Sequence, residues 1–272
     1  MPLDFHPIIK TTLSMSQPVL LTQNENVGII TFNRPEVFNS FNKELALMTL
    51  SALDEYAQNP EIRAVVITGN GKAFCAGQDL QEAIAPDFEI ENVVEKHYNP
   101  FIRKVRSIPK PILAAVNGVA AGAGANIAIA CDVAVATKSA SFIQAFSKIG
   151  LIPDSGGTFT LPRTIGFSKA SALMMLGDKT TAEEAEKMGM IYKVFEDDQF
   201  EQAVMDIARK LANMPTKALA NTKHLLNQSL INNLDQQLEL EKEFQFKSTQ
   251  TYDHQEGIRA FVEKRKPEFK GK

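Results

Sequence analysis

The chain has 272 residues, of which 44% are hydrophobic and 22% charged, and its formal net charge is -3. This size and composition allow a large buried core and predict one large or two closely joined globular domains. The slightly acidic balance provides no basic surface for nucleic acid or for an anionic membrane, so neither is expected as a partner.

The cysteines, the histidines and the N-terminal segment indicate the cellular compartment. Cys75 and Cys131 lack the spacing of a disulfide framework, and the four histidines are widely separated, so no metal site is expected. The first fourteen residues have no long apolar run, and no later segment has eighteen apolar residues in succession. We therefore expect a cytoplasmic protein without a membrane span, with an N-terminal tail at 1–17 and Met15 as an alternative start.

The first expected elements are a hairpin, a helix and a buried strand. Residues 18–33 contain two apolar runs separated by the polar turn Asn-Glu-Asn, which predicts a β-hairpin. Asn42 precedes apolar residues at helical spacing, so we expect a helix over 43–57 that this residue caps. A compact apolar strand is expected at 63–69, and a glycine-rich loop at 69–77 follows it.

Strands and helices continue to alternate through the middle of the chain. We expect a helix at 90–107 and strands at 112–116 and 133–137. A Gly/Ala-rich segment at 118–131 lies between the two strands. Alternation of this kind predicts an α/β core, here over 18–200. From residue 201 the patterns are helical only, so the region 201–272 is expected to consist of helices whose apolar faces need partners.

Two glycine-rich segments each follow an expected strand, GNGKAFCAGQDL at 69–80 and NGVAAGAGANIAIACD at 117–132. Backbone N–H groups beyond a strand or in the first turn of a helix have no partner within the element and can bind an oxyanion. Close packing of helix on sheet explains the small residues of either segment alone equally well. Neither segment has a dinucleotide fingerprint or a P-loop ending, so phosphate transfer from nucleotides is not expected.

Six motifs that together run from about residue 18 to the end resemble the crotonase, or enoyl-CoA hydratase/isomerase, superfamily. They are FNRPEVFNSFN, AFCAGQDL, NGVAAGAGANIAIACD, GLIPDSGGTFTLPR, TAEEAEKMGMIYKVF and EGIRAFVEKRKPEFKGK. The resemblance implies an α/β fold with a ββα spiral core and a C-terminal helical trimerisation region. It also implies an acyl-CoA substrate, a homotrimer or a dimer of trimers, and no cofactor other than the coenzyme A of the substrate.

By the same resemblance, the backbone N–H groups of Gln78 and Ala123 form an oxyanion hole for the thioester carbonyl. Loss of one such donor typically raises a reaction barrier by about 3–4 kcal/mol. Family members that hydrate enoyl thioesters are expected to carry two glutamates, and the matching positions here hold Asn126 and Phe146. Neither side chain transfers a proton at neutral pH, so hydration is not expected.

Asp154, in GLIPDSGGTFTLPR, is the carboxylate that remains. An isomerisation needs one group that takes a proton from one carbon and returns it to another, and burial raises the pKa of a lone carboxyl group. The alternative is that Asp154 caps a helix beginning at 155–157. We predict acid/base catalysis by Asp154. The sequence is most similar to family members that convert the ring 1,2-epoxide of phenylacetyl-CoA into an oxepin thioester in phenylacetate catabolism.

Three alternatives stay open. A linear Δ3,Δ2-enoyl-CoA isomerase or hydratase-like enzyme of fatty-acid oxidation carries similar motifs. Asp154 as a nucleophile, as in halobenzoyl-CoA dehalogenases, is less consistent with the sequence because 138–160 contains no histidine to activate water. A non-catalytic acyl-CoA-binding assembly protein would keep the fold and lose the chemistry.

The resemblance also indicates substrate-binding residues. Phe261 and Lys264 match positions at which the C-terminal helix of a neighbouring subunit touches the nucleotide end of coenzyme A, although a solvated surface explains Lys264 equally well. Arg34, Lys72 and Lys266 are further candidates for its phosphates. The other predicted substrate contacts are Val37, Cys75, Ala76, Asp79, Leu80, Gly122 and Phe146.

Overall fold

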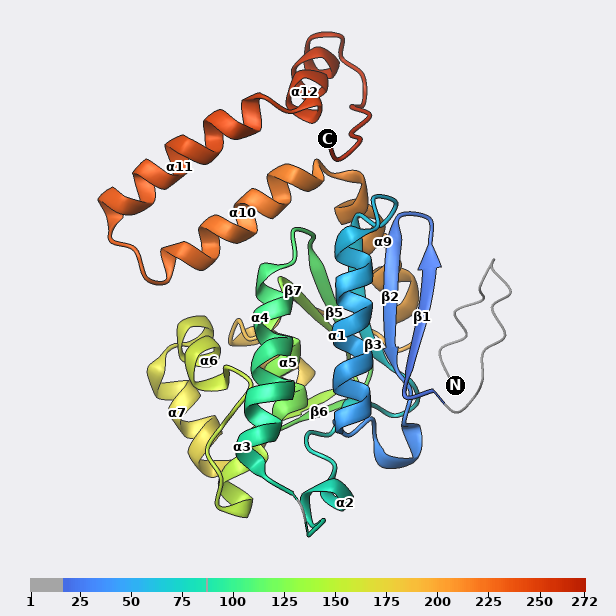
Figure 1. Cartoon of the computed structure of the whole chain (residues 1–272), viewed down its shortest axis with the longest axis vertical. Coiled ribbons are helices and arrows are strands. Elements are labelled where there is room, and N and C mark those ends of the chain that lie inside the picture. The colour runs from blue at the N-terminus through green and yellow to red at the C-terminus, as the bar shows by residue number, and fades with distance from the viewer. Residues whose placement is uncertain (1–16, 87) are drawn as a thin grey trace.

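The computed structural model describes residues 17–86 and 88–272 (Figure 1). Apart from Gln17, the expected N-terminal tail at 1–17 lies outside the described residues. Two β-sheets form the centre of the described chain, one six-stranded and one four-stranded. Most of its helices cover these sheets, and the last three extend away from them (Figure 1).

The six-stranded sheet has the order β1-β2-β3-β5-β7-β10, and all its neighbours except β1 and β2 are parallel. The hairpin expected at 18–33 is confirmed as β1 paired with β2. Every residue of β3 is buried, as its continuous apolar run predicts for a parallel strand covered on both faces. The strand bounds are β1 (Val19–Asn24), β2 (Val27–Phe32), β3 (Ala64–Gly69), β5 (Ile112–Val116), β7 (Val133–Thr137) and β10 (Lys193–Phe195).

The four-stranded sheet has the order β4-β6-β8-β9 and consists of three-residue strands. The expectation of a single loop at 69–77 is wrong, because β4 lies within it. Each of β3, β5 and β7 is followed by a strand of the smaller sheet and then by helix, so the chain forms the expected ββα spiral. The bounds are β4 (Ala73–Cys75), β6 (Val119–Ala121), β8 (Ser141–Ile143) and β9 (Lys179–Thr181).

Helices cover both faces of the larger sheet. On one face pack α1 (Lys43–Gln58), α4 (Asn99–Ser107) and α5 (Ala123–Ala130), and on the other packs α9 (Phe200–Asn213). Asn42 caps α1 as predicted, because its Oδ1 accepts a hydrogen bond of 2.9 Å from the Leu45 N–H. The smaller helical elements are η1 (Pro35–Val37), α2 (Leu80–Ala83), α3 (Ile90–Val93), the π-helical turn η2 (Val94–Tyr98), η3 (Ala145–Ile149), α6 (Gly157–Ile165), α7 (Phe167–Leu176) and α8 (Ala182–Lys187).

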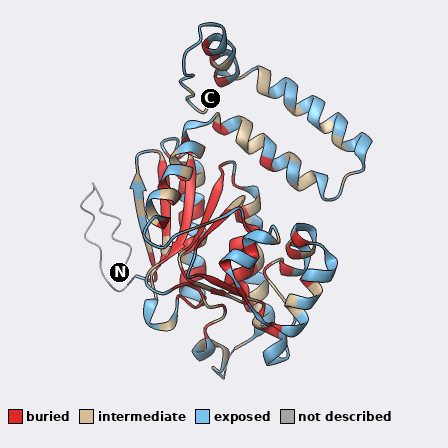
Figure 2. Cartoon of the chain, turned by 180° about the vertical axis from the view of Figure 1, so that it is seen from behind, coloured by how far each residue is buried: buried red, intermediate tan, exposed pale blue. Residues whose placement is uncertain are grey.

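The last three helices, α10 (Thr216–Ser229), α11 (Leu234–Thr249) and α12 (Tyr252–Val262), extend away from the sheets (Figure 1). We call residues 216–272 the arm and the described residues before it the body. Buried residues are concentrated in the body, and α11 has none (Figure 2). The division expected at residue 200 stays a prediction, although α9 packs against the sheet and so belongs to the body. Within the described residues, none of the helices combines the length and apolar character needed to cross a membrane.

Candidate active site

Three segments meet at one edge of the four-stranded sheet. Because β4, β6 and β8 are parallel neighbours, their carboxyl ends lie side by side. Gln78 follows β4, Ala123 follows β6, and Phe146 and Asp154 follow β8. The sheet therefore brings together the segments that carry the predicted catalytic residues.

The backbone N–H of Gln78 points away from its neighbouring segment. A parallel bridge joins Gln78 to Phe41, in which the Phe41 N–H donates to Gly77 O at 2.6 Å and the Asp79 N–H donates to Phe41 O at 3.0 Å. Because successive N–H groups of an extended chain alternate in direction, the N–H between these bonds faces the other side. It has no acceptor among the described residues.

Ala123 is the first residue of α5, and its N–H has no acceptor among the described residues either. The first N–H groups of a helix have no partner within it. Gly77, at φ +95°, lies directly against this helix start, because a Cβ added there would lie 3.7 Å from the Ala123 nitrogen. The two amide donors therefore lie on adjoining segments, as an oxyanion hole requires.

The carboxylate of Asp154 does not cap α6. This helix begins at Gly157, its N-cap Gly156 makes no side-chain bond, and only the backbone carbonyl of Asp154 accepts from the Gly157 N–H, at 2.9 Å. Its Oδ1 instead accepts a hydrogen bond of 3.0 Å from Ser155 Oγ. Burial raises the pKa of Asp154 to about 6, against the opposing effect of the Ser155 hydrogen bond. The carboxyl group thus has a pKa close to neutral pH, which suits proton transfer in both directions.

Asn126 and Phe146 occupy the positions at which hydrating members of the family are expected to carry glutamates. The fully buried Asn126 donates from Nδ2 to Asp154 O at 2.9 Å and accepts from Gln144 Nε2 at 2.8 Å. Phe146 is buried and lies near Gly122, where an added Cβ would approach its ring to 3.7 Å. The sequence identified Asn126 only as a missing carboxylate, whereas the structure assigns it contact with the Asp154 segment.

Tyr98 also belongs to this region, and the sequence did not identify it. Its hydroxyl donates to Gln78 Oε1 at 2.6 Å, and Gln78 Nε2 donates to Glu82 Oε2 at 2.8 Å. Burial raises the pKa of Tyr98 well above its ordinary value, and the nearby Asp154 carboxylate raises it further. The tyrosine therefore lies within electrostatic reach of Asp154 and in contact with Gln78.

The other residues of the Gln78 segment have different environments. Cys75 is fully buried and burial raises the pKa of its thiol to about 12, so it is not a nucleophile and only its backbone is available for contacts. Asp79 is also buried, accepts from the Gln81 N–H of α2 and pairs with Arg34 at 2.7 Å. Arg34, a candidate for a phosphate, is thus already paired. Leu80 is 70% exposed.

Val37 and Gly122 lie at the ends of short elements near this segment. Val37 ends η1 and is half-buried, as is Ala76. Gly122 is the N-cap of α5 at φ +52°, and its N–H donates to Ile143 O at 2.8 Å. A positive φ favours glycine, so the backbone conformation explains why residue 122 is a glycine.

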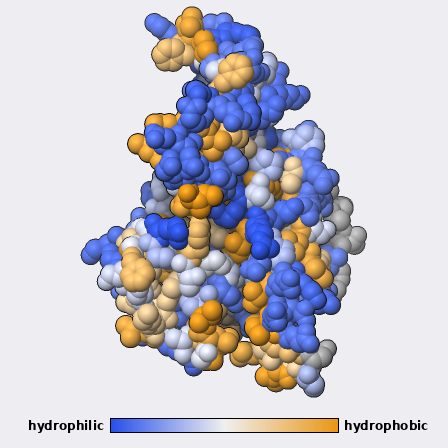
Figure 3. Space-filling model, turned by 60° about the vertical axis from the view of Figure 1, so that its left-hand side comes forward, coloured by the Kyte–Doolittle hydropathy of each residue, from blue (hydrophilic) through white to orange (hydrophobic). Residues whose placement is uncertain are grey.

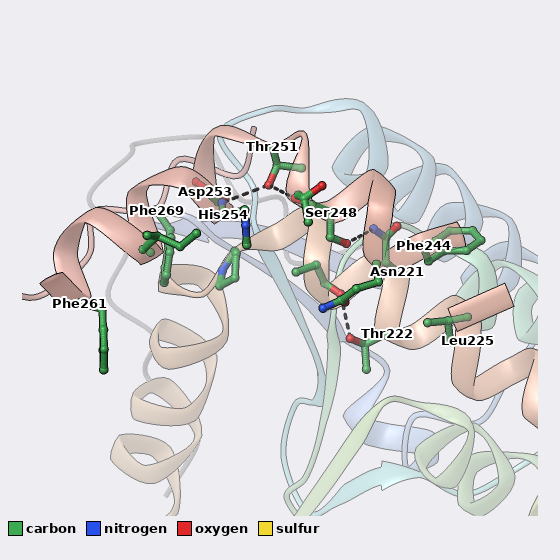
Figure 4. Close-up of a pocket in the computed structure, with 16 residues that line it drawn as sticks. Asn221, Thr222, Leu225, Phe244, Ser248, Thr251, Asp253, His254, Phe261 and Phe269 are labelled. Carbon is green, nitrogen blue, oxygen red and sulfur yellow. Dashed lines mark hydrogen bonds between the residues drawn. The ribbon is translucent and has the colours of Figure 1, made fainter. Parts of the chain in front are cut away.

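Within one chain, Phe261 and Lys264 do not reach this site. Phe261 lies in α12 and is 85% exposed, and Lys264 follows that helix, at the end of the molecule opposite α2 (Figure 1). Figure 4 shows Phe261 beside a hollow of about 580 Å³ that is lined by α10, α11, α12 and the C-terminal residues. Among the described residues there is no group of three or more His, Cys, Asp or Glu side chains that could hold a metal ion.

Comparison with known proteins assigns the chain to a family. The model of the enoyl-CoA hydratase/isomerase family matches residues 22–272. The chain belongs to this family. It is 42% identical over 264 residues to the 1,2-epoxyphenylacetyl-CoA isomerase of Escherichia coli (strain K12), covering 95% of this chain and all of that protein. It is 43% identical over 249 residues to the "Probable enoyl-CoA hydratase" of Rhodobacter capsulatus, covering 92% and 96% of the two chains.

A solved structure confirms the crotonase fold of this family member. The crystal structure of an enoyl-CoA hydratase from Bacillus anthracis superposes with a TM-score of 0.90, at 32% identity, over 94% of this chain and all of that one. Another relative, 35% identical over 259 residues, is the trans-2-decenoyl-[acyl-carrier-protein] isomerase of Streptococcus mutans, covering 93% of this chain and 98% of that one. Relatives named as isomerases and as hydratases therefore both align along nearly the whole chain.

Proposed function

We propose that this family member isomerises a coenzyme A thioester. The backbone N–H groups of Gln78 and Ala123 bind the thioester carbonyl oxygen and stabilise the enolate. The Asp154 carboxylate removes a proton from the carbon next to the thioester and returns it to another carbon of the same substrate. Because the proton and all electrons stay with the substrate, the reaction needs no further cofactor.

The environment of Asp154 is the observation that carries this proposal. Its carboxyl group has a pKa of about 6 because of burial, and it does not cap α6. The two positions where a hydratase is expected to carry its glutamates hold a hydrogen-bonded amide and a phenyl ring. A titrating acid whose segment contacts α5 through Asn126, together with two amide donors that have no acceptor among the described residues, supports isomerisation over addition of water.

As substrate we propose the ring 1,2-epoxide of phenylacetyl-CoA, converted to the oxepin thioester. Support comes from the name of the Escherichia coli relative, to which the chain is 42% identical over the whole length of that relative. The buried ring of Phe146 beside Gly122 is consistent with an apolar substrate. A linear 3-enoyl-CoA thioester is the second candidate, because relatives named as a probable hydratase and as an acyl-carrier-protein isomerase align almost as completely.

The proposed assembly is a homotrimer or a dimer of trimers. Support comes from the arm, whose exposed apolar side chains need a second surface within an assembly. In such an assembly Phe261 and Lys264 of one chain would contact the nucleotide end of coenzyme A held by a neighbouring copy. This arrangement explains how residues that lie far from Gln78 in one chain serve a single site.

The substitution Asp154→Asn tests the chemistry. Asparagine keeps the shape and can accept from Ser155 Oγ, so we expect isomerisation to fall by at least about 1,000-fold while phenylacetyl-CoA still binds. For the unsubstituted protein, kcat/KM should fall about tenfold per pH unit below pH ~6, because only the ionised carboxylate accepts a proton. Turnover is measured with the ring epoxide, a linear 3-enoyl-CoA and a linear 2-enoyl-CoA in water.

The matched control is Asp178→Asn, since Asp178 is exposed and lies outside the site. It should leave every rate unchanged. Retained isomerisation in Asp154→Asn would exclude this carboxylate as the acid/base group. Faster hydration of the 2-enoyl thioester than isomerisation of either other substrate would show that the protein is a hydratase.

A further inference from the structure

The hydroxyl of Tyr98 contacts the side chain of a proposed oxyanion donor from a fully buried position. Tyr98 is 1% exposed, and its ring stacks on Phe41 with centroids 5.1 Å apart. Its Oη donates to Gln78 Oε1 at 2.6 Å, near the short end of the range for a hydrogen bond between oxygens. The tyrosine therefore contacts Gln78 through its hydroxyl and the bridge partner of Gln78, Phe41, through its ring.

The amide of Gln78 is held on both sides. Its Nε2 donates to Glu82 Oε2 at 2.8 Å, and the other oxygen of Glu82 accepts from the Lys43 N–H at the start of α1, at 3.0 Å. Glu82 can accept a hydrogen bond and not donate one when ionised, so it fixes which end of the amide faces Tyr98. The chain of bonds from Tyr98 through Gln78 and Glu82 to Lys43 therefore has one orientation.

The π-helical turn η2 places Tyr98 in this position. It inserts a wide turn between α3 and α4 and ends at Tyr98 itself. One extra residue in a helix rotates everything after it by about 100°, so an α-helical turn here would direct the Tyr98 side chain elsewhere. Such insertions occur often at functional sites.

We propose that Tyr98 is a positioning residue for the oxyanion hole. Its hydroxyl holds the Gln78 side chain, and with it the backbone, so that the Gln78 N–H stays directed at the thioester carbonyl. This inference rests on the proposed function of the Gln78 N–H and adds a residue to it. The phenol stays neutral throughout the range of an assay, because burial and Asp154 both raise its pKa.

A second buried tyrosine, Tyr56, serves as a control that distinguishes a positioning role of Tyr98 from a purely structural one. Tyr56 is 4% exposed, and its hydroxyl donates to Thr22 O at 3.0 Å, between α1 and the β1–β2 hairpin. Tyr98→Phe and Tyr56→Phe remove the same atom from comparable surroundings, and both keep the ring. We expect both to lower thermal stability to a similar extent, and only Tyr98→Phe to lower kcat, by about tenfold, with KM changed less than about threefold.

The vibration of the substrate carbonyl reports the oxyanion hole directly. We expect the infrared C=O stretch of bound phenylacetyl-CoA, labelled with ¹³C at the carbonyl, to lie below that of the free thioester. The shift should be smaller in Tyr98→Phe and unchanged in Tyr56→Phe. In combination with Gln78→Leu, which keeps the backbone N–H, Tyr98→Phe should cause no further loss of kcat or of shift.

The carbonyl measurement separates this inference from the role of Asp154, since it needs no turnover and can be repeated in Asp154→Asn. An active Asp154→Asn variant would reject the proposed acid/base group and leave the Tyr98 result standing. The positioning role would be overturned if both tyrosine substitutions reduced the shift of the C=O stretch equally, or if neither reduced it. A Tyr98→Phe effect that multiplies with that of Gln78→Leu would also overturn it.

Discussion

The body and the arm of this chain are built on different principles. All eight residues of α5, at the centre of the body, are buried. In the three helices of the arm the buried residues are Thr216, Lys223, Asp253, Glu256 and Ala260, of which one is apolar. The body thus builds an apolar core within one chain, whereas the arm holds its buried positions mainly with polar residues.

Many large apolar side chains of the arm are exposed. Figure 3 shows apolar patches on the extended helices as well as on the lower part of the body. Exposed apolar side chains on the arm include Leu226, Ile231, Leu234, Leu238, Phe246, Ile258, Phe261 and Val262. Because exposed apolar surface is typical of interaction sites and the arm helices bury almost no apolar residue, the two regions are suited to separate tasks. The body carries the proposed chemistry, and the arm is suited to assembly.

A few polar contacts attach the arm to the body. Lys223 Nζ contacts Asp132 Oδ2 at 2.8 Å, and Asp132 Oδ2 also accepts from the Ile112 N–H of β5 at 2.8 Å. Arg63, just before β3, donates to the Phe269 carbonyl at 2.7 Å and to Thr216 Oγ1 at 3.0 Å. The attachment therefore includes one ion pair and hydrogen bonds from the Arg63 guanidinium to uncharged oxygens.

The largest effect is expected from Lys223→Met. Lys223 is 7% exposed, so its loss leaves the Asp132 carboxylate without its cation in a region of low solvent access. Removal of one partner of such a pair costs about 3–5 kcal/mol. We expect a loss of this size in the free energy of unfolding, with hydrogen exchange in α10 accelerated more than in β3.

The control for this change is Lys242→Met, which removes an equivalent ion pair with Glu239 from the exposed surface of α11. Exposed pairs contribute little, so stability should change by less than about 1 kcal/mol. Equal losses in the two variants would contradict the view that buried polar contacts hold the arm.

A smaller effect, on assembly, is expected from Leu238→Glu. Leu238 lies on α11 and is 51% exposed, so the carboxylate introduced by the substitution is solvated in a single chain. In an interface the same carboxylate would be removed from water, which is unfavourable. We expect assembly to weaken by about 100-fold or more in sedimentation measurements, with an unchanged circular dichroism spectrum. Phe167→Glu, at an 81% exposed position of the body, should leave assembly intact. The reverse result would place the interface on the body.

The sequence predicted the elements whose pattern is local. The β1–β2 hairpin, the capped helix α1 and the strands β3, β5 and β7 each have a periodicity or an apolar run of their own. The strands of the smaller sheet were not predicted, because three residues are too few to show a period and their stability comes from pairing with distant segments. For the same reason the glycine-rich segment at 69–77 was expected to be a loop.

At the candidate site the sequence identified residues but not their environments. Asp154 could be named from its segment, but the burial that raises its pKa arises only when the segments after β4, β6 and β8 are packed together. Tyr98 has no distinguishing pattern, since a tyrosine among apolar residues is typical of a core. The pairing of Arg34 with Asp79 was likewise missed, because it joins positions 45 residues apart, from 34 to 79.

The smallest expected effect concerns the stability cost of the site itself. The pKa of Asp154 is raised from 3.8 to about 6, so the folded state binds this proton more tightly than the unfolded state. The protonated carboxyl group contributes its full stabilisation of the folded state below pH ~4, and this contribution is lost as the pH rises through about 6. At neutral pH the carboxylate is ionised in an environment that disfavours its charge. Because Asp154 is only partly buried, we estimate this cost as about 2 kcal/mol.

Asp154→Asn should therefore stabilise the body by about 2 kcal/mol at pH 7 and by almost nothing at pH 4, as measured by denaturant unfolding. Asp178→Asn, at an exposed position, should change stability at neither pH. A gain that is equal at both pH values would indicate better packing of asparagine rather than relief of a buried charge. A pH-dependent gain would instead show that the body keeps a destabilising carboxylate, which is expected where selection acts on chemistry and not on stability alone.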